Sequence, residues 1–185
     1  MHKIFASLTV LAALVAVPSA LHATPITGQF SITGASVTDN GSSLTFIPNS
    51  IAVGSTNTIT GDFSTLLTAA EPGTITQTIA YNPYTSGSGV ITLTNPDGTI
   101  VTYTIDTLTE TTVGGFDLFT GTGIISTNAA GFDPTEGTLL FSSQGNGTVT
   151  FSATTTASPV PEPSTLALLG TGLVGLAGVI KRRLA

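Results

Sequence analysis

The chain has 185 residues, of which 41% are hydrophobic and only 8% are charged, and its formal net charge is −6. This length suits one domain with short appendages. The absence of Cys excludes disulfides, thiolate catalysis and thiolate metal sites. The four basic residues all lie close to the two ends: Lys3, Lys181, Arg182 and Arg183. Both histidines precede residue 24, so the long central part has no group to activate a serine or to bind nucleic acid.

Residues 1–23 have the three parts of a secretory signal peptide. A basic start is followed by an apolar run over residues 4–17, a proline and several small residues. The apolar run is shorter than the roughly 20 residues that a membrane helix needs. We expect export by a Sec-type machinery and cleavage after Ala23, with Ala20 and Ser19 as alternative cleavage sites. A buried N-terminal helix is the competing interpretation.

Residues 24–153 alternate between apolar and polar side chains. In residues 99–106, for example, Val101, Tyr103 and Ile105 oppose threonines and an aspartate. This period of two is typical of strands, and no stretch in this part shows a convincing helical period. Residues 95–98, Asn-Pro-Asp-Gly, predict a hairpin between strands near 89–94 and 99–106. The sequence therefore predicts an all-β fold, an antiparallel β-sandwich or barrel-like domain of about nine or ten short strands.

Two other runs alternate in the same way. Residues 75–81 alternate Ile75, Ile79 and Tyr81 with smaller or polar residues. Residues 148–153 follow a Gln-Gly-Asn-Gly turn signal and alternate around three apolar residues: Val149, Phe151 and Ala153. We expect both runs to form strands, the second being the last before a Thr-, Ser- and Pro-rich linker at residues 154–163.

Carboxylates are the only candidate acid–base groups in the central domain. They are Asp39, Asp62, Glu71, Asp97, Asp106, Glu110, Asp117, Asp133 and Glu136. Turn positions explain Asp39, Asp97 and Asp133, and a solvent-facing strand explains Asp106 and Glu110. A glycoside hydrolase that uses only carboxylates needs two of them about 5–10 Å apart. We expect no enzymatic activity, and this hydrolase is one alternative.

Any metal would have to bind through oxygen ligands, which favours Ca²⁺ over transition metals. Asp133 with Glu136, or Asp117 on a neighbouring strand, are the candidate ligands. Solvated turn carboxylates are the simpler interpretation of these three residues. We therefore expect no cofactor and no resident metal. Binding of Ca²⁺ remains the alternative.

Tyr81 and Tyr84 are the candidate ligand-binding residues, because they flank an Asn-Pro pair outside the clearest strands. Two rings on one loop could stack on a sugar. Rings in such a position can instead cover an edge of the core. A carbohydrate-binding module is therefore a second alternative, and it predicts that both tyrosines are exposed beside a groove.

The C-terminal tail, residues 160–185, begins with Val-Pro-Glu-Pro-Ser-Thr and continues with an uncharged apolar run. A transmembrane helix over about residues 164–180 would be about 26 Å long, which is short but usable in a bilayer core of about 30 Å. The basic end at residues 181–183 is expected to stay cytoplasmic. The β domain would then lie on the opposite side of the membrane.

Pro161, Glu162 and Pro163, followed by the apolar run and by Lys181, Arg182 and Arg183, resemble the PEP-CTERM protein-sorting tail. The resemblance implies a Gram-negative bacterium with an extracellular polysaccharide system. It also implies an exosortase, a membrane-embedded cysteine protease or transpeptidase, which recognises the motif and cuts nearby. A plain tail anchor is the alternative.

These expectations combine into one hypothesis. The chain would be a structural protein of the cell surface or extracellular matrix, first tethered to the inner membrane and then processed at its tail. It would associate with exopolysaccharide or biofilm. Its acidity repels an acidic polysaccharide unless Ca²⁺ bridges the two, and it disfavours nucleic acid.

Overall fold

The computed structural model describes residues 23–113, 116–143, 170–172 and 175. Ten strands lie in this part of the chain: β1 (Thr24–Pro25), β2 (Ile32–Asp39), β3 (Ser43–Val53), β4 (Pro72–Ile75), β5 (Thr78–Ala80), β6 (Gly89–Thr94), β7 (Ile100–Val113), β8 (Phe116–Thr127), β9 (Phe132–Asp133) and β10 (Thr135–Ser143). Two short helical turns, η1 (Thr56–Thr58) and α2 (Phe63–Leu66), connect β3 to β4. The expected all-β composition is confirmed.

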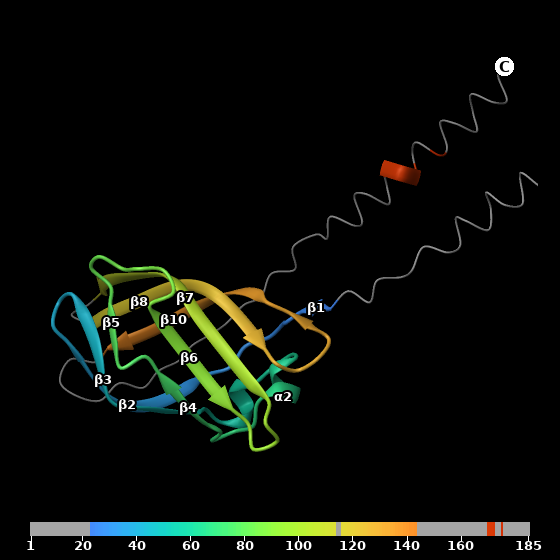
Figure 1. Ribbon diagram of the computed structural model, residues 1–185. Helices are drawn as coiled ribbons and strands as arrows, with labels where there is room; N and C mark the ends of the chain where they lie inside the picture. Colours follow the sequence, from blue (N-terminus) through green and yellow to red (C-terminus); the bar gives the residue numbers. More distant parts are fainter. Residues whose placement is uncertain (1–22, 114–115, 144–169, 173–174, 176–185) are drawn as a thin grey trace, which may run out of the picture.

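One eight-stranded sheet makes up most of the domain. Its strand order is β10-β8-β7-β6-β4-β3-β2, with β5 also paired to β3, and every pairing is antiparallel. A separate parallel pair joins β1 to β9. The sheet curls, with β7 and β8 on the upper side of the domain in Figure 1 and β2 and β4 on its lower side. The fold is therefore one curled sheet and not two stacked sheets.

The hairpin predicted at residues 95–98 joins β6 to β7. Gly98 has a φ of 91°, which glycine adopts without strain. The Asp97 carboxylate accepts a hydrogen bond from the backbone N–H of Thr99 at 2.8 Å. Inward residues on both strands are buried, and Tyr103 is 1% exposed. Local turn chemistry and a period of two thus suffice to fix this hairpin.

A bulge in β7 strengthens the curl. The register of β7 against β8 shifts between Ile105 and Thr107, and bulges increase the local twist of a strand. Across from the bulge, Gly123 is buried, and a Cβ at this position would collide with the backbone oxygen of Thr104. The missing side chain therefore lets β8 approach β7 closely where the sheet bends.

The run at residues 75–81 is not one continuous strand. β4 ends at Ile75, where the chain still follows β6, and the Thr76 N–H donates to the Val90 carbonyl at 2.9 Å. The next carbonyl, of Gln77, accepts from the Phe46 N–H of β3 at 2.8 Å. β4 already pairs with β3, so the chain leaves β6 after Thr76 and stays beside β3 as β5. The alternation is interrupted here, because Gln77 is exposed between the buried Ile75 and Ile79.

Phe119 lies at the centre of the core and is fully buried. Its ring stacks on Phe141 of β10 at a centroid distance of 4.7 Å. Its edge meets Tyr81, which follows β5, at 5.1 Å. β5 is far from β8 and β10 in the strand order, so these contacts show that the sheet closes around one core.

Several expectations lie outside the described residues. They are the signal peptide before Ala23, the strand at 148–153, the linker and most of the membrane helix. Residues 170–172 and 175 are helical and exposed. Within the described ranges, no helix is both long and apolar enough to cross a bilayer.

Candidate functional site

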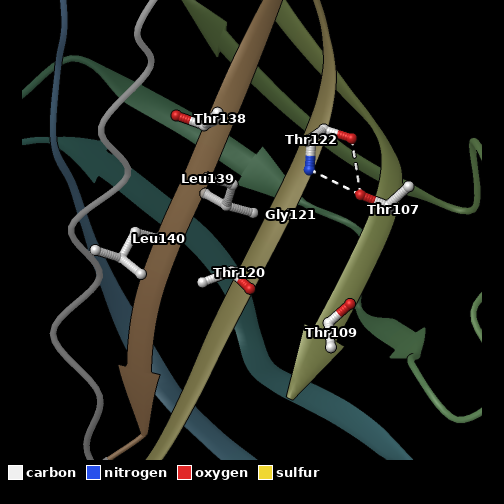
Figure 2. Close-up of a pocket in the computed structure, with 8 residues that line it drawn as sticks. All are labelled: Thr107, Thr109, Thr120, Gly121, Thr122, Thr138, Leu139 and Leu140. Atoms are coloured by element: carbon white, nitrogen blue, oxygen red, sulfur yellow. Dashed lines mark hydrogen bonds between the residues drawn. The ribbon is translucent and has the colours of Figure 1, made fainter. Parts of the chain in front are cut away.

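A groove of about 520 Å³ lies on the outer face of β7, β8 and β10 (Figure 2). Its lining consists of outward-facing threonines, a backbone glycine and two leucines: Thr107, Thr109, Thr120, Gly121, Thr122, Thr138, Leu139 and Leu140. The strand register produces this surface. Thr122 lies opposite both Thr107 and Thr138, so hydroxyl and methyl groups form a row across three strands.

The groove offers polar contacts without charge. Thr107 Oγ1 and Thr122 Oγ1 lie 2.7 Å apart and share a hydrogen bond. The Thr122 N–H also donates to Thr107 Oγ1 at 3.1 Å, and Figure 2 shows both bonds. Leu140 is 44% exposed and gives the groove an apolar side. None of the described residues that line the groove is titratable, so these residues suit binding of a neutral ligand and supply no acid–base catalyst.

A second constellation consists of three half-buried carboxylates, Asp39, Glu110 and Asp117. One oxygen from each lies within 4.8 Å of the others. Asp39 ends β2, whereas Glu110 and Asp117 lie on β7 and β8. These oxygens are hard ligands of the kind that Ca²⁺ prefers. We call these three residues the acidic cluster.

Hydrogen bonds hold two of these carboxylates in place. Asp39 Oδ1 accepts from the Gly41 N–H at 2.8 Å and from the Tyr81 hydroxyl at 2.7 Å. Asp117 Oδ1 accepts from the Thr112 hydroxyl at 3.0 Å. The sequence has no Lys or Arg between residues 4 and 180 to neutralise the acidic cluster. Among the described residues, hydrogen-bond donors and no cationic side chain therefore compensate its negative charge.

The structure corrects the prediction for Tyr81 and Tyr84. Tyr81 is 6% exposed, and its ring packs against Phe119. Burial raises the pKa of Tyr81, and its hydrogen bond to Asp39 raises it further. Tyr84 donates to the Ile105 carbonyl at 2.7 Å. Neither ring lines the groove, because the two residues pair with each other in a β-bridge and cover the core.

The predicted calcium ligands are only partly brought together. Asp117 joins the acidic cluster, but Asp133 and Glu136 are exposed and lie outside it. Asp39 was assigned to a turn and Glu110 to a solvent-facing strand. Asp39 does serve the turn through Gly41, and it also enters the acidic cluster. The curl of the sheet brings these three carboxylates together. No local sequence pattern indicates that curl, so the acidic cluster could not be predicted.

Other carboxylates have local structural roles. Asp62 Oδ2 accepts from both the N–H and the hydroxyl of Thr27 at 2.7 Å. Asp106 accepts from the Ser86 hydroxyl at 3.1 Å. The first pair of bonds joins two loops, and the second ties a loop to β7. They explain two of the candidate acids without any catalytic role.

Glu71 is a buried carboxyl that the sequence pattern does not single out. It is 3% exposed, and its Oε2 accepts from the Thr68 N–H at 2.8 Å. Its other oxygen, Oε1, has no hydrogen-bond partner among the described residues. Burial raises the pKa of Glu71; the bond from Thr68 lowers it, and the charge of Asp97 raises it. The fold therefore favours the neutral acid more than the unfolded chain does.

Comparison with known proteins identifies the tail. A family model described as the PEP-CTERM protein-sorting motif matches residues 159–183. This match confirms the motif predicted at Pro161, Glu162 and Pro163. It implies sorting to the cell surface through an exosortase. No curated protein and no solved structure matches the chain.

We predict that Glu71→Gln stabilises the domain at neutral pH and changes little near about pH 4. Because the pKa of Glu71 is raised in the folded state, its contribution to the free energy of unfolding is fully present at low pH. That contribution is lost as pH rises through the folded-state pKa. Glutamine stays neutral throughout. Chemical denaturation from acidic to neutral pH measures the effect, with the exposed Glu136→Gln as control. A Glu71→Gln difference that does not grow with pH would contradict the assignment.

We predict that Asp117→Asn raises the melting temperature in chelator-containing buffer, because it removes one of three like charges. Millimolar Ca²⁺ should stabilise the wild-type chain more than this variant, since the ion binds only the complete acidic cluster. The control is Asp133→Asn, which leaves the acidic cluster whole. The prediction is wrong if Ca²⁺ raises the melting temperatures of the wild type and both variants equally, and if NaCl of the same ionic strength does the same. That result would mean that Ca²⁺ only screens charge.

Proposed function

We propose that the chain is a structural protein of the cell surface or extracellular matrix, delivered there by its sorting tail. The match to the sorting motif at residues 159–183 carries this proposal. The β domain supports it through what its sequence lacks. Residues 24–153 contain no His, Cys, Lys or Arg, and none of the described residues that line the groove is titratable. A scaffold or adhesive role needs none of these groups.

The tail would act in three steps. The apolar run at 166–180 would hold the exported chain in the inner membrane, with residues 181–183 kept on the cytoplasmic side. Pro161 and Pro163 disfavour a helix and would keep the motif extended. An exosortase would then cut near Glu162 and release the β domain toward the surface.

The acidic surface would govern association with the matrix. Carboxylates are the only charged groups in the β domain. An anionic exopolysaccharide would therefore be repelled from most of it. Divalent cations at carboxylates such as the acidic cluster, or neutral contacts in the groove, would permit attachment within a biofilm. Attachment to an anionic polysaccharide would therefore use bridging cations or neutral contacts and not direct ion pairs between protein and polysaccharide.

The hydrolase alternative gains no support from the groove. A glycoside hydrolase places two carboxyls on either side of the scissile bond. The groove on β7, β8 and β10 is lined by threonine, glycine and leucine. In the acidic cluster, one carboxylate is held by the buried Tyr81 hydroxyl. We therefore propose a role without catalysis.

Replacing Pro161, Glu162 and Pro163 together by alanine should leave an unprocessed chain in the membrane fraction. The reason is that the exosortase loses its recognition motif while the apolar run stays intact. Immunoblotting of fractionated native cells measures this outcome. Replacing the neighbouring Thr154, Thr155 and Thr156 by alanine is the control and should leave processing normal. Normal processing of the motif variant would refute the sorting proposal.

A second candidate role is binding of a neutral glycan in the groove. Its volume lies within the range of about 300–1,000 Å³ typical of ligand sites. Threonine hydroxyls can exchange hydrogen bonds with sugar hydroxyls, and their methyl groups with Leu140 can cover the apolar faces of a sugar ring. The candidate site for sugar binding is therefore the groove and not the pair Tyr81 and Tyr84.

Leu140→Asp should weaken retention on a neutral polysaccharide column by about tenfold or more, because it puts a charge on the apolar side of the groove. Val113→Asp is the matched control, since Val113 is also exposed but lies outside the groove. Affinity electrophoresis gives the dissociation constants. Equal retention of both variants and the wild type would remove the groove as a glycan site.

A further inference from the structure

Residues 24–27 are built into the fold of the β domain. Strand β1 pairs in parallel with β9, and Ile26, the residue after β1, is fully buried. The Ile26 N–H donates to Thr135 Oγ1 at 2.8 Å. A segment near a chain terminus is ordered when contacts of this kind tie it down. The start of the β domain is therefore a part of its structure.

The contacts continue along the chain from β1 into the core. The N–H and the hydroxyl of Thr27 both donate to Asp62 Oδ2 at 2.7 Å. Three residues later, the ring of Phe30 packs against Phe63 at a centroid distance of 4.8 Å. These contacts hold the segment that begins at Thr24 in one position on the domain.

The backbone nitrogen of Thr24 donates to the Gly131 carbonyl at 2.9 Å, and the Thr24 hydroxyl donates to the same oxygen at 3.2 Å. This nitrogen belongs to the Ala23–Thr24 peptide bond, where we expect the signal peptide to be cut. Cleavage there would turn the amide into the amino terminus of the exported chain. An ammonium group has three N–H donors, so it can keep the bond to Gly131.

The new terminus would be the only cationic group in residues 24–180, because this stretch has no Lys, Arg or His. The described elements that bond to residues 24–27 carry three titratable residues, all of them carboxylates: Asp62, Asp133 of β9 and Glu136 of β10. Such surroundings favour the charged form of an amine. An ionised donor also makes a stronger hydrogen bond than a neutral amide does.

We propose that the amino terminus freed by cleavage after Ala23 is a structural group, which binds the Gly131 carbonyl and fixes β1 against β9. This inference rests on the proposed export of the chain. Cleavage after Ala20 or Ser19 would leave three or four residues in front of Thr24 and would place the charge elsewhere. The site of cleavage therefore decides whether the domain gains this charged bond.

The same geometry sets an order of events. In the docked state, the N–H of the Ala23–Thr24 bond is already bonded to Gly131, and the next residue, Pro25, pairs with Asp133 of β9. A protein that binds a peptide as an extended strand uses these same backbone groups. A signal peptidase that binds its substrate in this way would therefore cut before β1 docks.

The absence of Lys from residues 4–180 permits a direct test, because the new terminus is then the only amine in that stretch. The exported protein is purified from its own cells and labelled with acetic anhydride near neutral pH. Mass spectrometry of its fragments identifies the first residue and measures labelling there, separately from any remaining Lys181. The control precursor carries one glycine inserted between Ala23 and Thr24, which moves the amine one residue away.

We expect the wild-type terminus to react about threefold or more slowly than that of the control, because a bonded, protonated amine is a poor nucleophile. In concentrated urea, the two rates should be equal. An amine whose pKa is raised by folding stabilises the domain below its unfolded pKa of about 8, and this contribution is lost as pH rises. Between about pH 7 and pH 9.5, the melting temperature of the wild type should therefore fall by about 2 °C more than that of the control.

Two results would overturn the inference. Equal labelling rates for the folded wild type and the folded control would mean that the terminus is free in solution. An exported chain that starts at Leu21 or Ala20 would mean that no amine forms at Thr24. Neither result depends on the tail. A protected terminus at Thr24 on a chain that keeps residues 166–185 would support this inference and refute the sorting proposal alone.

Discussion

In the described part of the chain, no helical layer covers the antiparallel sheet. The sheet must therefore bury its apolar face against itself, and the rest of this structure depends on that constraint. Phe119 marks the point of closure. It stacks on Phe141 of β10 and meets Tyr81 from the far side of the strand order. The bulge at Asp106 and the side-chain-free position at Gly123 allow the required bend. Removing the curl would leave these aromatic side chains exposed to water.

The same constraint determines the chemistry of the outer face. Inward positions take the apolar residues, so threonines alternate to the outside and form the neutral groove on β7, β8 and β10. The curl also gathers Asp39, Glu110 and Asp117, which lie far apart in the chain. The molecule thus presents a neutral hydroxyl-lined surface and a concentrated negative charge at different places. A matrix protein can use the first for sugars and the second for cations.

Features that depend on a few neighbouring residues could be predicted from the sequence, whereas features that depend on the curl could not. The hairpin at residues 95–98 and the sorting motif at 161–163 are local patterns, and both are confirmed. The local pattern left Tyr81 open between a sugar-binding loop and an edge of the core, because its burial follows from contact with Phe119, 38 residues further along the chain. Glu71 gave no local signal because its burial comes from packing around the loop before β4.

The central claim is that the β domain is exported as a precursor and separated from its tail at the sorting motif. The most direct test is the intact mass of the native protein in each cell fraction. The account predicts an extracellular or surface species that starts near Thr24 and lacks residues 166–185, with any attached glycan visible as added mass. A native protein found only in the membrane, with residues 166–185 still attached, would contradict the account.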